Sequence, residues 1–87
     1  MKIKGDFILR EVVGEYVLIP VHETALHFDF IISLNAVGAK IWKGLQMQKS
    51  GAQILSDILD EFDVTVQEAM IDMAEFLDDL KQNNLIE

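Results

Sequence analysis

The chain has 87 residues, no cysteine and a formal net charge of −8. Without cysteine it forms no disulfide, has no thiol nucleophile and offers no thiolate to a metal. Its 15 acidic side chains against seven basic ones argue against binding to nucleic acid or to an anionic membrane, because such binding depends on Lys and Arg. Basic peptides or basic protein patches are the partners that this charge attracts.

The length predicts a single domain over residues 1–87. No apolar run approaches the ~20 residues that span a bilayer. The N-terminal stretch MKIKGDFILR lacks the apolar region of a secretory signal. We therefore expect a cytoplasmic protein.

Three segments rich in β-branched and aromatic residues predict strands over residues 7–13, 15–21 and 28–34. Gly14 stands between the first two, where a tight turn needs a permissive backbone, so these two are expected to form an antiparallel hairpin. Pro20 has no N–H to donate to a sheet and is expected near a strand end.

Three helices are predicted after the strands, each opened by a residue that favours the N-cap. Asn35 precedes a helix over about residues 36–46, and Ser50 and Thr65 open the second and third. The last two caps have capping-box partners three residues on, namely Gln53 and Glu68. Leu85 and Ile86 follow the last helix as a tail expected to pack back. The order β-β-β-α-α-α predicts an α+β fold with a three-stranded antiparallel sheet.

A catalytic site is hard to assemble from these residues. His22 and His27 form an HExxxH string, but a zinc helix needs histidines four apart on one face, and this segment resembles a loop. The carboxylates of the third helix lie opposite its apolar stripe and are explained by solvation. We expect no enzyme activity, no metal and no cofactor.

A binding surface is therefore the favoured interpretation. If residues 28–34 form the last strand, one edge of that strand is free, and a peptide can pair with it as an extra strand. Met70 and Met73 on the third helix suit the opposite wall, because a thioether adapts to varied partners. Filling gaps in the core is the alternative role for these methionines.

The string LNAVGAKIW at residues 34–42 resembles the LNxxGxxIW signature of the PQQ-biosynthesis protein D family. Members of this family are stand-alone recognition elements for ribosomally made precursor peptides. The strand pair FILREVVGEYVLIPV and the closing EFLDDLKQNNLIE fit the same outline. His27 and Phe30 depart from the small or acidic residues of many relatives, which leaves the choice of leader open.

The resemblance implies a winged-helix-like fold and a non-catalytic peptide chaperone. Such a chaperone binds the leader of a precursor peptide as an additional strand beside the third strand and against the third helix. It then presents the precursor to a modifying enzyme, often a radical SAM protein. Asn35, Gly38 and Trp42 are then structural, as cap, close packing and core anchor. The implied peptide-binding residues are Phe28, Phe30, Ile31, Ile32, Ser33, Leu34, Met70, Ile71, Met73, Ala74, Leu77 and Asp78.

Two alternatives remain open from the sequence. One is a general protein-interaction module that uses the same surface for a folded partner. The other is a diverged winged-helix regulator, although the Asp and Glu of the third helix are poorly suited to reading DNA bases. A monomer or a weak dimer is expected.

Overall fold

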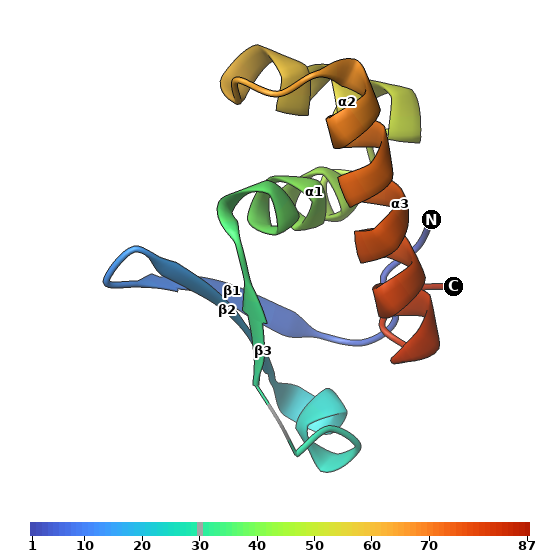
Figure 1. The fold of residues 1–87 in the computed structure, drawn as a ribbon. Coiled ribbons are helices and arrows are strands. Elements are labelled where there is room, and N and C mark those ends of the chain that lie inside the picture. Colours follow the sequence, from blue (N-terminus) through green and yellow to red (C-terminus); the bar gives the residue numbers. More distant parts are fainter. Residues whose placement is uncertain (30) are drawn as a thin grey trace.

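A computed structural model describes residues 1–29 and 31–87 of the chain. Three strands precede three helices, and the helices lie on one side of the sheet, with α1 nearest to it (Figure 1). The α+β class and the predicted element order are confirmed. The elements are β1 (Phe7–Val12), β2 (Glu15–Pro20), the short 3-10 helix η1 (His22–Leu26), β3 (Ile32–Leu34), α1 (Ala36–Gln46), α2 (Gly51–Glu61) and α3 (Val66–Gln82).

The sheet is antiparallel in the order β1-β2-β3, so that β3 forms one edge. Pro20 ends β2 opposite Phe7, as predicted. The third strand is shorter than predicted, because η1 follows β2 and strand geometry begins only at Ile32. Phe28 stands outside β3 and packs its ring edge-on against Phe7, with centroids 5.5 Å apart. Phe30, which was assigned to the same strand, lies outside the described residues.

The β1–β2 hairpin turns through Val13 and Gly14, with φ angles of 51° and 79°. Two positive φ values are characteristic of a type I′ turn, whose twist matches that of the flanking strands. A β-branched side chain is disfavoured there, and Val13 is 98% exposed, so no packing compensates for the strain.

Replacing Val13 by Asn is therefore expected to stabilise the protein by about 1 kcal/mol, because Asn tolerates positive φ. For a domain of this size that raises Tm by roughly 4–8 °C, measurable by thermal circular dichroism. Val12→Asn is the matched control, since Val12 is also exposed but belongs to β1. An equal rise in both variants would show that the strained turn is not the cause.

The core lies between the sheet and α1, with α2 and α3 packed around it. Trp42 and Ile41 of α1 are fully buried with Leu18 of β2 and Ile58 of α2. Figure 1 shows α1 crossing the middle of the molecule, between the sheet and α2. α1 is therefore the middle layer of the molecule, with the sheet on one side and α2 on the other.

The three predicted N-caps are confirmed. The side chain of Asn35 accepts a hydrogen bond from the N–H of Gly38 at 2.7 Å. Ser50 and Thr65 each accept one from the residue three positions later. These bonds satisfy amides of the first helical turns that have no partner within the helix.

The two ends of the chain pair with each other beside the C-terminal half of α3 (Figure 1). Lys4 donates its N–H to the carbonyl of Leu85 at 2.8 Å, and Glu87 donates to Lys2 at 2.9 Å. Leu85 and Ile86 are buried, so the predicted packing of the tail is confirmed. The pairing with the N-terminal segment was not predicted.

The carboxylate of Asp57 in α2 bonds to two side chains near the start of this helix. Lys49 Nζ lies 2.7 Å from Asp57 Oδ2, and Gln53 Nε2 donates to Asp57 Oδ1 at 2.9 Å. The hydrogen bond from Lys49, followed by that from Gln53, lowers the pKa of Asp57 below its ordinary value. This cluster holds the α1–α2 connection.

Candidate functional site

The outer edge of β3 is open. β3 pairs with β2 through Tyr16↔Leu34, Val17↔Ser33 and Leu18↔Ile32, and no strand of the described chain lies on its other side. The outward N–H and C=O groups of an edge strand lack sheet partners. Because side chains alternate along a strand, Ile32 and Leu34 face the helices and Ser33 faces away.

A pocket of about 230 Å³ lies between this strand and α3. It combines apolar side chains with polar ones, among them Asp79 of α3 and Asn83, the residue that caps the end of this helix. The lining residues are Ile32, Ser33, Leu34, Phe76, Asp79, Leu80, Asn83 and Leu85.

A second pocket, of about 210 Å³, continues from the first between α1 and α3. The two share Phe76 and Asp79, and we refer to them together as the β3–α3 groove. The second pocket is lined by Asn35, Val37, Gly38, Ile41, Asp72, Glu75, Phe76 and Asp79.

Gly38 determines how closely Phe76 approaches α1. A Cβ at Gly38 would lie 3.1 Å from Phe76 Cε1 and 3.3 Å from Asn35 Oδ1, which is tighter than ordinary contact. The missing side chain therefore lets the aromatic ring rest on α1, at the junction of the two pockets. The resemblance implied close packing at Gly38, and the neighbour is the side-chain ring of Phe76 on α3.

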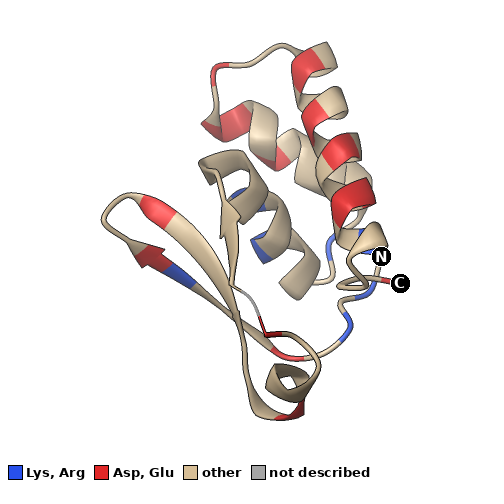
Figure 2. Ribbon diagram, turned by 60° about the horizontal axis from the view of Figure 1, so that its bottom comes forward, with Lys and Arg blue, Asp and Glu red and all other residues tan. Residues whose placement is uncertain are grey.

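One wall of the β3–α3 groove is acidic. Asp72, Glu75 and Asp79 line it from α3, and Figure 2 shows acidic residues recurring along this helix. Ile32 and Phe76 supply apolar surface beside them. Such a groove suits an extended ligand with apolar side chains and a nearby positive charge.

The predicted strand residues are partly brought to this groove. Ile32, Ser33 and Leu34 line it. Phe28 packs on Phe7 instead, and Ile31 precedes β3 with 62% of its surface exposed.

None of the predicted α3 residues lines either pocket. Met73 is in the core, and Leu77 packs against the core. Ala74 lies two residues from Phe76, which is about 200° round the helix axis. Their contact with a peptide stays a prediction, as it does for Met70, Ile71 and Asp78, which are exposed.

The residues of α3 that do line the groove were not predicted from the sequence. The signal was nonetheless present, because Asp72, Glu75 and Asp79 are spaced by three and four residues and so lie on one helical face. Phe76 belongs to the apolar stripe beside them. The boundary between an acidic row and an apolar stripe was the informative feature.

The two histidines of the HExxxH string lie at the ends of η1. His22 begins η1, 3.5 Å from Asp6, and His27 caps its end. In residues 1–29 and 31–87, no group of three or more His, Asp or Glu side chains is placed to hold a metal ion. No helix of the described chain has the length and hydropathy needed to cross a membrane.

The fold and the groove define a small α+β domain in which an open sheet edge faces an acidic helix. The sequence matches the family described as coenzyme PQQ synthesis protein D (PqqD) over residues 15–86, and the chain belongs to this family. The matched region runs from β2 to the tail and contains every residue of the groove. The resemblance carried by LNAVGAKIW is thereby confirmed.

A solved structure shares the fold. It is the structure of TbiB1 in complex with the TbiA(beta) leader peptide. The matched chain is 28% identical to this chain, and the two superpose with a TM-score of 0.77. The match covers 100% of this chain and 95% of TbiB1. A comparison with curated proteins found no match.

Proposed function

We propose that this protein binds the leader segment of a ribosomally made precursor peptide and presents it to a modifying enzyme. The leader adds as a fourth strand to the open edge of β3 and lies in the β3–α3 groove. The observation that carries the proposal is the open edge beside this groove. Membership of the PqqD family and likeness to a leader-bound relative support it.

The leader is held by two kinds of contact. Its backbone bonds to the outward groups of residues 32–34, which gives affinity with little dependence on sequence. Its apolar side chains occupy the space between Ile32, Phe76 and Leu80. A Lys or Arg of the leader lies near Asp79 or Asp72, where an ion pair fixes the register.

The protein itself carries out no catalysis and needs no cofactor. The chemistry belongs to the partner enzyme, of which a radical SAM protein is one kind. Binding of both partners raises the local concentration of the precursor to the millimolar range, so a modest leader affinity suffices. The protein acts in the cytoplasm as a monomer or weak dimer, and its net charge of −8 disfavours nucleic acid and anionic membranes.

The test is a titration of the isotope-labelled protein with a synthetic leader from a neighbouring precursor gene, followed by amide chemical shifts. We expect the shifts to concentrate in β3 and in residues 72–83. A leader N-methylated at its central residue loses a backbone donor and is expected to bind about tenfold more weakly. A leader N-methylated at a terminal residue, away from the segment expected to pair with β3, is the control. Amide shifts concentrated in α2 would contradict the proposal.

A further inference from the structure

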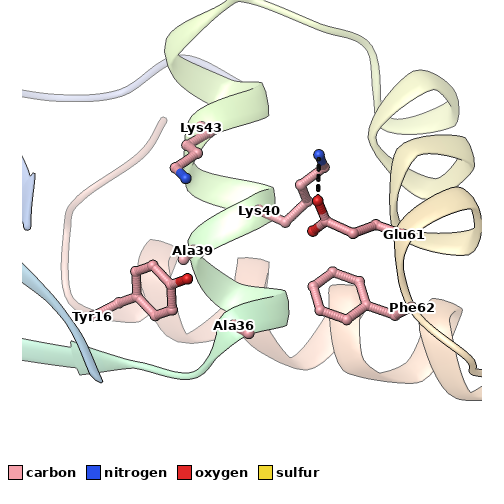
Figure 3. A pocket seen from close by; sticks show the side chains of 7 residues that line it. All are labelled: Tyr16, Ala36, Ala39, Lys40, Lys43, Glu61 and Phe62. Carbon is pink, nitrogen blue, oxygen red and sulfur yellow. Dashed lines mark hydrogen bonds and ion pairs between the residues drawn. The ribbon is translucent and has the colours of Figure 1, made fainter. Parts of the chain in front are cut away.

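A further pocket lies on the other side of α1. Its volume is about 280 Å³. The rings of Tyr16 and Phe62 stand on either side of Ala36 and Ala39 (Figure 3). Because alanine side chains end at Cβ, they leave a slot between the two rings. We call this site the α1 lysine pocket, for Lys40 and Lys43 at its rim.

Two ammonium groups border the slot, although the chain as a whole carries a net charge of −8. Lys43 Nζ lies 5.8 Å from the centroid of the Tyr16 ring, and within the described part of the chain no carboxylate forms an ion pair with Lys43. A positive charge beside an aromatic slot is suited to a carboxylate next to an apolar side chain.

Lys40 is the second cation, and its partner is replaceable. Its Nζ lies 3.4 Å from Glu61 Oε1, and the two side chains are 31% and 53% exposed. Exposed pairs of this kind contribute little to stability. An incoming carboxylate can therefore take the place of Glu61 at low cost.

The α1 lysine pocket is separate from the β3–α3 groove. Ile41 belongs to the groove and Lys43 to the pocket, and two residues correspond to about 200° round the axis of α1. β3 likewise stands between its own open edge and Tyr16 of β2. A leader bound at the open edge thus leaves the pocket free.

The size of the pocket limits what it can hold. Pockets that enclose drug-sized molecules or cofactors measure about 300–1,000 Å³, and this one lies at the lower limit of that range and is open between two rings. It matches a single large side chain presented by another protein. Because Lys40 and Lys43 border the pocket, the partner's side chain should be flanked by acidic residues of the same partner.

We propose that the α1 lysine pocket binds an acidic segment of the modifying enzyme through one apolar side chain flanked by carboxylates. This inference rests on the proposed function, because it assigns opposite sides of α1 to the leader and to the enzyme. The acidic groove attracts a basic leader, and the lysine pocket attracts an acidic partner. The opposite charges keep each ligand from the other's site.

The test uses a defined probe, an acetylated hexapeptide with a central Leu-Phe pair between Asp and Glu residues. We expect saturable amide shifts at Tyr16, Ala39, Lys43 and Phe62. Lys43→Glu is expected to weaken the probe about tenfold. Lys81→Glu is the matched control, because it makes the same charge change on α3, and it is expected to have little effect.

A second hexapeptide, with Asn and Gln replacing the acidic residues, tests the charge. Equal binding of the two peptides, or equal loss in Lys43→Glu and Lys81→Glu, would overturn the proposal. Displacement of the acidic probe by the leader would overturn it as well, since the pocket would then belong to the leader site. If the probe binds the pocket while the leader fails to bind the groove, the proposed function fails and the pocket assignment stands.

Discussion

Ile32→Glu is expected to weaken leader binding by at least about tenfold, because it places a charge where an apolar leader side chain must pack. Ile32 is half-buried in β3 and lines the groove. The carboxylate of Asp79, which lines the same pocket as Ile32, adds repulsion to the new charge. The effect is measured by fluorescence anisotropy of a labelled leader.

Ile8→Glu is the matched control for this variant. It makes the same substitution in β1, the strand at the opposite edge of the sheet, where Ile8 is 40% exposed and lines neither pocket of the groove. Its leader affinity is expected to stay within about threefold of the parent. Far-UV circular dichroism checks that both variants fold, and an equal loss in both would show that the groove face of β3 is not the binding surface.

Met70→Glu separates two descriptions of the helix wall. The sequence placed Met70 at the peptide, whereas the groove is lined by Phe76 and Asp79, and Met70 is 55% exposed outside it. If the groove is the site, this third variant binds the leader like the parent. A loss as large as that of Ile32→Glu would restore the wall predicted from sequence.

Local chemistry explains why the order of elements could be predicted. Each N-cap depends on a side chain and an amide three residues apart, as with Asn35 and Gly38. The hairpin turn was predicted from Gly14, which has a φ of 79°. Such signals are contained within a few residues, so the sequence displays them directly.

The length of β3 could not be predicted in the same way. The apolar run over residues 28–34 reads as one strand, because aromatic and β-branched residues suit both a strand and a core-facing loop. Phe28 packs against Phe7, a contact across 21 residues of sequence that no local pattern reveals. The tertiary contact takes Phe28 out of the strand pattern, which begins only at Ile32.

The helix wall predicted from the sequence differs from the α3 residues that line the groove, and it stays a prediction. Apolar periodicity identifies the buried stripe of α3 but not which flank of that stripe faces β3. Met70 and Ala74 lie on one flank of the stripe, whereas Asp72 and Asp79, which line the groove, lie on the other. The same limit hid the α1 lysine pocket, because Tyr16 and Phe62 meet α1 from two distant elements.

Trp42→Ala is expected to be the most destabilising of these substitutions, with a loss of about 3–5 kcal/mol in the free energy of unfolding. Trp42 is fully buried, and its ring meets Phe7 edge-on at 5.6 Å. A domain of this length has a total stability of about 4–13 kcal/mol. The substitution therefore removes a large share of it, as urea unfolding followed by far-UV circular dichroism will show.

Trp42→Phe distinguishes a core anchor from a ligand contact. Phenylalanine keeps an aromatic ring against Phe7, so the loss of stability is expected to be smaller than for Ala. Trp42 lines neither pocket of the β3–α3 groove, and leader affinity should be unchanged in the folded variant. If Trp42→Phe stays folded but no longer binds the leader, Trp42 contributes to recognition directly. A role in core packing alone would lower the free energy of unfolding without changing the leader affinity of the folded variant.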